Sequence, residues 1–79
     1  MPEYAERFAV GAEVRIEDAS VLESFAAAWK LHNPLKPEQL AFAGKLGVVT
    51  QVGFYHGGDP LYQVSGAPGV WHEACLRAP

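Results

Sequence analysis

Residues 46–64 read LGVVTQVGFYHGGDPLYQV, and this stretch decides the fold class. Its first part, from Leu46 to Val52, is rich in β-branched residues, which favour an extended strand. The run His56-Gly57-Gly58-Asp59-Pro60 then interrupts the pattern with residues that are typical of turns. Leu61 to Val64 resumes it. The stretch therefore predicts two strands joined by a short connection.

The flanking sequence adds further strands on both sides. Upstream, Val14 and Ile16 alternate with charged residues, which indicates a strand with one buried face. Downstream, a turn at 65–69 precedes a strand at 70–72, and residues 73–76 form a short turn or a final strand. Short strands at this spacing favour a small β-barrel or meander over a helical fold. Closing the sheet on itself removes its unpaired edges, so we expect a barrel.

A helix is predicted between the first two strands. Residues 20–23, Ser-Val-Leu-Glu, have the form of a capping box, in which Ser20 and Glu23 satisfy each other's backbone amides. A helix over 21–32 follows, with Leu22, Phe25 and Trp29 spaced along one face. Asn33-Pro34 ends it.

A shorter helical turn is predicted over 36–40, with Pro37 at its first position. Gly44 is placed to end that turn in a left-handed conformation. The fold expected from the whole chain is therefore mainly β, with about five short strands and one helix inserted after the first strand.

Length and charge limit the classes of function. The 79 residues have room for one domain, spanning 1–79, and nine acidic against six scattered basic residues give a net charge of −3. That balance argues against nucleic acid as the main partner. Cys75 is the one cysteine, which excludes an internal disulfide, and no apolar stretch is long enough for a signal peptide or a membrane span. We therefore expect a cytoplasmic protein without a membrane partner.

Four short motifs carry a family resemblance. They are Gly-x-x-Val-x-Ile at 11–16, Gly-Lys-x-Gly-x-Val at 44–49, Leu-Tyr-x-Val at 61–64 and Trp-x-Glu-x-x-Leu at 71–76. In this order they resemble a bacterial SH3-like barrel, with the barrel domain of the nitrile hydratase β subunit as the closest pattern. The metal centre of that enzyme belongs to a cysteine cluster in its other subunit, and this chain has nothing similar. The resemblance therefore implies the fold and not nitrile hydration.

No pattern of catalytic or metal-binding residues stands out. His72-Glu73-x-Cys75 could bind zinc or activate a thiol, but strand alternation places His72 and Glu73 on opposite faces. A small buried cysteine is the simpler interpretation. We therefore predict no cofactor, no metal and no enzymatic activity.

Aromatic residues are the candidates for binding. Trp29 and Trp71 are interpreted first as core residues, but strand register decides whether Trp71 instead lines a groove with its aromatic neighbours. The aromatic-glycine loop at 54–60 is either a simple hairpin or a binding loop. The candidate binding residues are Trp29, Phe54, Tyr55, His56, Tyr62 and Trp71.

Two functions remain open. The first is an interaction module that binds a protein partner, or itself as a homo-oligomer, through a barrel face carrying Tyr55, Tyr62 and Trp71. The second is a small-molecule binder or accessory subunit, with a pocket between helix 21–32 and the barrel that takes an apolar or cationic ligand on Trp29 and Phe25. Whether Trp29 lines a cavity separates the two.

Overall fold

The computed structural model describes residues 6–55 and 58–79, and it confirms a mainly β fold with one inserted α-helix. A 3₁₀ helix follows the α-helix, and a second one precedes the last strand. The elements are, in chain order, β1 (Glu13–Ile16), α1 (Ala19–Ala28), the 3₁₀ helix η1 (Pro37–Phe42), β2 (Leu46–Tyr55), β3 (Asp59–Val64), β4 (Ala67–His72), the 3₁₀ helix η2 (Glu73–Cys75) and β5 (Leu76–Arg77).

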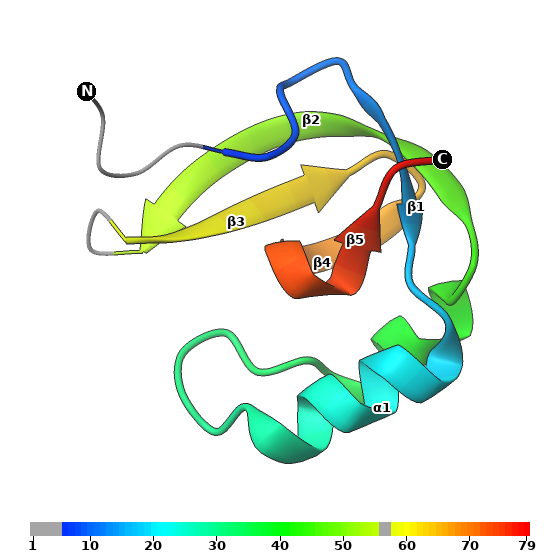
Figure 1. Ribbon diagram of the computed structural model, residues 1–79, viewed down its shortest axis with the longest axis vertical. Coiled ribbons are helices and arrows are strands. Elements are labelled where there is room, and N and C mark those ends of the chain that lie inside the picture. The colour runs from blue at the N-terminus through cyan, green and yellow to red at the C-terminus, as the bar shows by residue number, and fades with distance from the viewer. Residues whose placement is uncertain (1–5, 56–57) are drawn as a thin grey trace.

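The five strands form one antiparallel sheet in the order β4-β3-β2-β1-β5. The long strand β2 joins its two halves, because residues 46–48 pair with β1 and residues 49–55 pair with β3. The register shifts between Val49 and Gln51, where the partner of β2 changes. Such an irregularity lets a strand bend, and Figure 1 shows β2 arching over the other strands.

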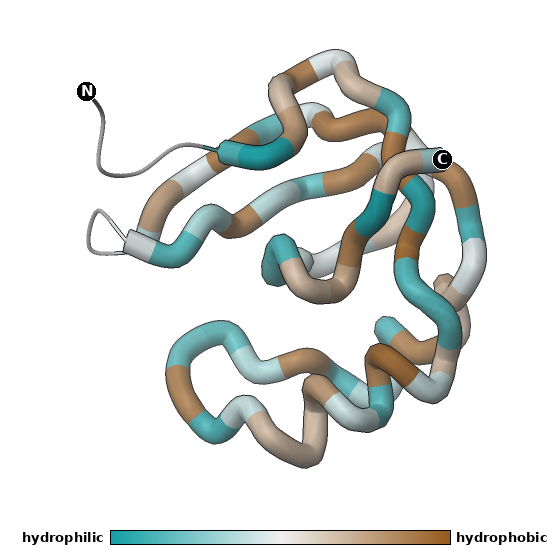
Figure 2. The backbone as a smooth tube through the Cα atoms, in the orientation of Figure 1, coloured by the Kyte–Doolittle hydropathy of each residue, from teal (hydrophilic) through white to brown (hydrophobic). Residues whose placement is uncertain are grey.

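The core lies inside this curved sheet. Val14 and Ile16 of β1 point into it, as their alternation predicted, and Leu22 of α1 covers it from the helix side. In Figure 2 hydrophobic and hydrophilic residues alternate along much of the sheet, as expected for strands with one buried face. The other buried apolar residues are Phe8, Leu35, Val49, Tyr62, Val64, Ala67, Trp71, Cys75 and Leu76.

The start of α1 differs from the prediction. Asp18 is the N-cap residue, and its backbone carbonyl accepts hydrogen bonds from the amides of Val21 and Leu22. Ser20 lies inside the first turn, so the capping box predicted for Ser20 and Glu23 is wrong. Both Asp and Ser suit an N-cap, and local sequence alone did not separate the two positions.

The end of α1 also differs, because the helix stops at Ala28 instead of His32. Trp29 is already extended, with φ −89° and ψ 111°. Its indole N–H donates to the carbonyl of His32 at 2.7 Å, a contact that a continuing helix would not make. Leu31 is left 67% exposed in the segment beyond the helix.

The second helical turn is confirmed as the 3₁₀ helix η1, which begins at Pro37. Gly44 has φ +77°, the left-handed conformation predicted for it. The predicted turn or strand after residue 72 is both, since η2 leads directly into β5. In Figure 1, α1 lies below the sheet, with η2 on the side of the sheet that faces it.

Candidate functional site

Two of the candidate binding residues, Tyr62 and Trp71, belong to the core. Both side chains are 0% exposed, and the indole N–H of Trp71 donates to the carbonyl of Ala67 at 3.1 Å. Neither ring is available to line a surface groove. This corrects the hypothesis of an aromatic barrel face, because the strand register that the sequence left open turns both rings inward.

The hydroxyl of Tyr62 holds the N-terminal segment to the sheet. It accepts from the backbone amides of Arg7 at 2.9 Å and Phe8 at 3.3 Å, and it donates to the Glu73 carboxylate at 2.6 Å. Burial, followed by the bond to Glu73, raises the pKa of Tyr62 above its ordinary value. This polar end of Tyr62 is therefore fully used within the fold.

Phe54 and Tyr55 lie at the end of β2, where they are 38% and 41% exposed. They are paired across the hairpin with Pro60 and Asp59. The ring of Tyr55 stacks on His32, with centroids 3.6 Å apart and planes 8° apart. The sixth candidate, His56, lies outside the described residues.

Trp29 lies at the C-cap of α1 and is half-buried. Its ring stacks on Phe25 one helical turn earlier, at a centroid distance of 5.6 Å. It also contacts His72 of β4 at 4.9 Å. The inserted helix is thus joined to the sheet through a group of rings, and Trp29 is one of its partly exposed members.

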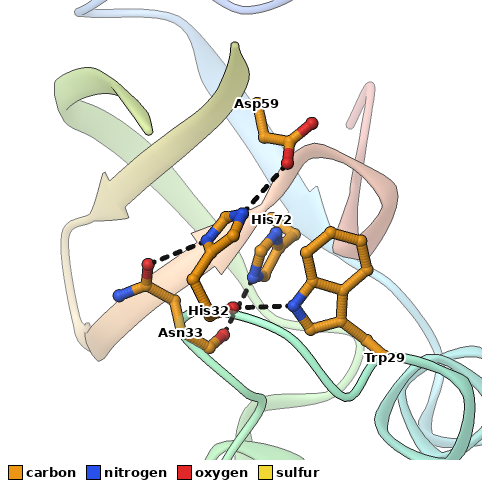
Figure 3. A network of polar contacts seen from close by, with 5 residues as sticks. All are labelled: Trp29, His32, Asn33, Asp59 and His72. Atoms are coloured by element: carbon orange, nitrogen blue, oxygen red, sulfur yellow. Dashed lines mark hydrogen bonds and ion pairs between the residues drawn. The ribbon is translucent and has the colours of Figure 1, made fainter. Parts of the chain in front are cut away.

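His32 connects the segment after α1 to the hairpin. Its Nε2 lies 3.0 Å from Oδ2 of Asp59, and its Nδ1 lies 3.1 Å from Oδ1 of Asn33 (Figure 3). The Asp59 side chain is 56% exposed and the His32 side chain 11%, so the carboxylate lies at the surface and the imidazole is largely covered. Contacts from α1, β2, β3 and β4 therefore converge around this one imidazole.

His72 is the buried histidine of the cluster. Its Nε2 lies 2.8 Å from the backbone carbonyl of Asn33 and, because a carbonyl only accepts, this nitrogen carries the proton (Figure 3). Burial lowers the pKa of His72 below its ordinary value, although the Asn33 carbonyl opposes the shift. His72 is thus held as a neutral donor.

A pocket of about 280 Å³ opens between α1 and the β3–η2 side of the sheet. One wall is aromatic and comes from α1. The opposite side brings two carboxylates, and among the described residues that line the pocket there is no lysine or arginine. The lining residues are Phe25, Trp29, Asp59, Pro60, His72, Glu73 and Ala74.

A second hollow of about 570 Å³ lies between η1 and β4. Its floor includes Gln39, whose amide accepts from the backbone N–H of Lys36 and donates to the carbonyl of Val70. Gly69 has φ +100°, and a Cβ there would lie 2.9 Å from the Gln39 amide nitrogen. Both ends of the Gln39 amide already have partners. Lys36 and Glu38 bring one charge of each sign to the lining, beside apolar side chains such as Phe42.

The residues of the His72-Glu73-x-Cys75 motif bind separate partners. His72 donates to Asn33, Glu73 accepts from Tyr62, and burial raises the pKa of the Cys75 thiol to about 11. A thiol with so high a pKa is a poor nucleophile at neutral pH. Across residues 6–55 and 58–79, no group of three or more His, Cys, Asp or Glu side chains is arranged to hold a metal ion.

Comparison of the chain with models of protein families, with curated proteins and with solved structures found no match. Within the described ranges, no helix has the length and apolar character needed to cross a membrane. The function is therefore inferred from the geometry of the pocket between α1 and the β3–η2 side of the sheet.

Sequence reasoning found Trp29 and Phe25 but missed the cluster around His32 and Asp59. These two residues are 27 positions apart, and His72 reaches Asn33 across 39 positions. The sequence signal for this cluster was limited to the positions of the two residues: His32 lies near the end of the predicted helix, and Asp59 lies in the predicted hairpin. Neither pattern indicates its partner.

Proposed function

We propose that the protein is a non-enzymatic binding module whose binding site is the pocket between α1 and the β3–η2 side of the sheet. The observation that carries this proposal is the aromatic wall of Phe25 and Trp29, which the inserted helix brings against two carboxylates. Binding sites are concave, largely apolar and equipped with a few polar groups. This pocket has all three properties.

The scaffold we propose is an SH3-like barrel. Its support is the pairing of β1 with both β2 and β5, the bend in β2 and the 3₁₀ helix between β4 and β5. The short motifs that resemble the nitrile hydratase β subunit agree with this scaffold. A barrel of this kind would act as a rigid support, and the inserted helix would add the site.

The pocket is compatible with both kinds of ligand that the sequence left open, a protein partner and a small molecule. It is small enough to take a side-chain tip of a protein partner or the head of a small molecule. Phe54 and Tyr55 at the neighbouring end of β2 extend the exposed aromatic surface beyond the pocket. A protein partner would use that surface in addition to the pocket, whereas a small ligand would not.

The two tryptophans provide an internal test. In an isotope-labelled sample, their indole N–H groups give two separate NMR signals, one from half-buried Trp29 and one from fully buried Trp71. We expect a screen of mixed small fragments and short peptides to move the Trp29 signal and to leave the Trp71 signal in place. Trp29→Leu, which lacks the first signal, should abolish binding of the hits when binding is measured by calorimetry, while Leu31→Ala, on the exposed segment nearby, should not.

The opposite result would refute the proposed site. If no fragment or peptide moves the Trp29 signal, or if Trp29→Leu binds as well as the original protein, the pocket is not where the protein binds.

Self-association is a second candidate, favoured by the outer face of β1 and β2. Here exposed Val48 lies opposite Glu13, and exposed Leu46 lies opposite Arg15. A second copy related by two-fold symmetry would place Glu13 against Arg15 of the partner subunit, around the two apolar side chains.

Charge reversal tests this arrangement by light scattering at high protein concentration. Glu13→Arg and Arg15→Glu should each weaken a dimer, and the double variant should restore it. A chain that is monomeric at every concentration would exclude self-association, without affecting the pocket.

A further inference from the structure

The charge of the pocket is one-sided. Asp59 and Glu73 contribute two carboxylates, and the described residues that line the pocket include no lysine or arginine. His72 is the one basic side chain among them, and burial lowers its pKa. The described part of the lining is thus acidic at neutral pH.

The aromatic wall adds a second, independent preference. Phe25 and Trp29 stack nearly parallel, with planes 14° apart, and both remain partly exposed. The face of an aromatic ring attracts a cation electrostatically, and tryptophan is the strongest of the aromatic side chains in this respect. An apolar ligand would use the rings but would bring no positive charge to offset the two carboxylates.

Hydrogen bonding narrows the kind of cation. Oε2 of Glu73 already accepts from the Tyr62 hydroxyl and from the backbone amide of Arg7. Oδ2 of Asp59 already faces His32 at 3.0 Å. An ammonium or guanidinium group brings several N–H donors that all need acceptors. One oxygen of each carboxylate is thus engaged within the fold. A quaternary ammonium group brings charge and apolar surface without any donor, so it can bind here without a new bond to either carboxylate.

The size of the pocket agrees with a small headgroup. Its volume of about 280 Å³ lies just below the range of roughly 300–1,000 Å³ that is typical of drug-sized ligands. The exposed Asp59 lies at the surface, and His72 lies in the interior. A ligand would thus enter on the solvent side of Asp59.

We propose that this pocket binds a quaternary ammonium group. The proposal rests on the function proposed above and names the chemical class of its ligand. Two sources share this chemistry: a free small molecule such as choline, and a trimethylated lysine side chain on a protein partner.

The experiment compares choline with 3,3-dimethylbutan-1-ol, a neutral molecule of nearly the same shape. Binding is followed by the Trp29 indole signal and by calorimetry at low ionic strength. We expect choline to bind about tenfold or more tightly than the neutral analogue, because charge adds to apolar contact. Guanidinium, which carries donors on every nitrogen, should bind more weakly than tetramethylammonium.

Two variants locate the effect in the pocket. Asp59→Asn removes one charge but keeps the shape, and it should reduce the preference for choline over its neutral analogue. Trp29→Leu should remove binding of both. The Trp71 indole signal reports in each case whether the core is intact, so a loss of binding is not mistaken for unfolding.

The source of the group is tested with short peptides that contain lysine or trimethyllysine. A preference for the trimethyllysine peptide over free choline indicates a protein partner, and the reverse order indicates a small molecule.

Equal affinity for choline and the neutral analogue, or an unchanged preference in Asp59→Asn, would overturn the cation proposal while leaving the binding pocket in place. If neither compound nor any fragment moves the Trp29 signal, the proposed function itself fails.

Discussion

Two groups of aromatic residues in this molecule differ in how far their rings are buried. In the sheet, Tyr62 and Trp71 are fully buried, and their polar atoms bond to Glu73 and to the backbone. At the helix side, Phe25 and Trp29 are only partly covered, and they border a pocket. Burial of large rings stabilises a small domain efficiently, so the sheet aromatics are explained by folding alone. The helix-side aromatics leave apolar surface in contact with solvent, and binding would explain that exposure.

The largest expected effect tests this contrast directly. Trp71→Ala removes a fully buried ring from the core, which costs about 3–5 kcal/mol in the free energy of unfolding. Trp29→Ala should cost clearly less, because its ring is only half-buried. Urea unfolding followed by circular dichroism measures both. Equal losses in the two variants would mean that Trp29 is a core residue like Trp71, and the contrast would not hold.

The next effect concerns the polar end of the sheet region. Tyr62→Phe keeps the ring but removes the hydroxyl that the Phe8 amide uses as its acceptor, while the Arg7 amide keeps its bond to the Glu73 carboxylate. Unsatisfied groups of this kind cost about 1–3 kcal/mol. Amide exchange should also become faster at Arg7 and Phe8 than elsewhere in the molecule. A variant with unchanged stability and exchange would show that this network does not hold the N-terminal segment.

A smaller effect follows from His72 and depends on pH. Burial lowers its pKa in the folded state, so the unfolded chain binds the proton more readily. The contribution of neutral His72 to the free energy of unfolding is therefore fully present above the ordinary histidine pKa of about 6.5. It is lost progressively as the pH falls below that value.

The unfolding midpoint should accordingly decrease between pH 7.5 and pH 5. His72→Gln, whose amide can still donate to the Asn33 carbonyl, should flatten this part of the profile. His32→Gln serves as the comparison at the second imidazole of the cluster, which contacts Asp59. A slope that persists in His72→Gln would assign the pH dependence to another group.

The smallest effect is expected at the surface of the pocket. Asp59→Asn removes the charge beside His32 but keeps an amide that can still hydrogen-bond to it. Because the aspartate is also 56% exposed, the stability should change by less than about 1 kcal/mol. The same substitution is expected to reduce the preference for a cation. A change in ligand preference without a change in thermal unfolding would separate binding from stability at this residue.

Much of the sheet was predictable because its signals are local. The alternation of Val14 and Ile16, the β-branched run from Leu46 and the position of Gly44 each depend on neighbouring residues. The boundaries of α1 were less predictable, because Asp18 and Ser20 suit the same N-cap role. The helix also ends at Ala28, before the predicted stop at Asn33-Pro34, and the Trp29 indole bonds to the His32 carbonyl in the segment beyond it.

The candidate site was predictable only in part. The spacing of Phe25 and Trp29 indicated a helical face, and the possibility of a pocket followed from it. The side that completes the pocket comes from Asp59 and Glu73, which are distant in sequence and are brought there by the hairpin and by η2. The inward orientation of Tyr62 and Trp71 depends on strand register, which no local pattern specifies.

The pairing of β1 with β5 has a consequence for the speed of folding. Ile16 lies opposite Leu76, and the ion pair of Arg77 with Glu17 joins residues 60 positions apart. These contacts form only after a long loop has closed, and the entropy lost in closing it slows the search for the native state. A chain of this topology is expected to fold in milliseconds to seconds, whereas small helical bundles fold in microseconds to milliseconds. The fluorescence of Trp71, which is fully buried in the folded core, would report folding in a stopped-flow measurement.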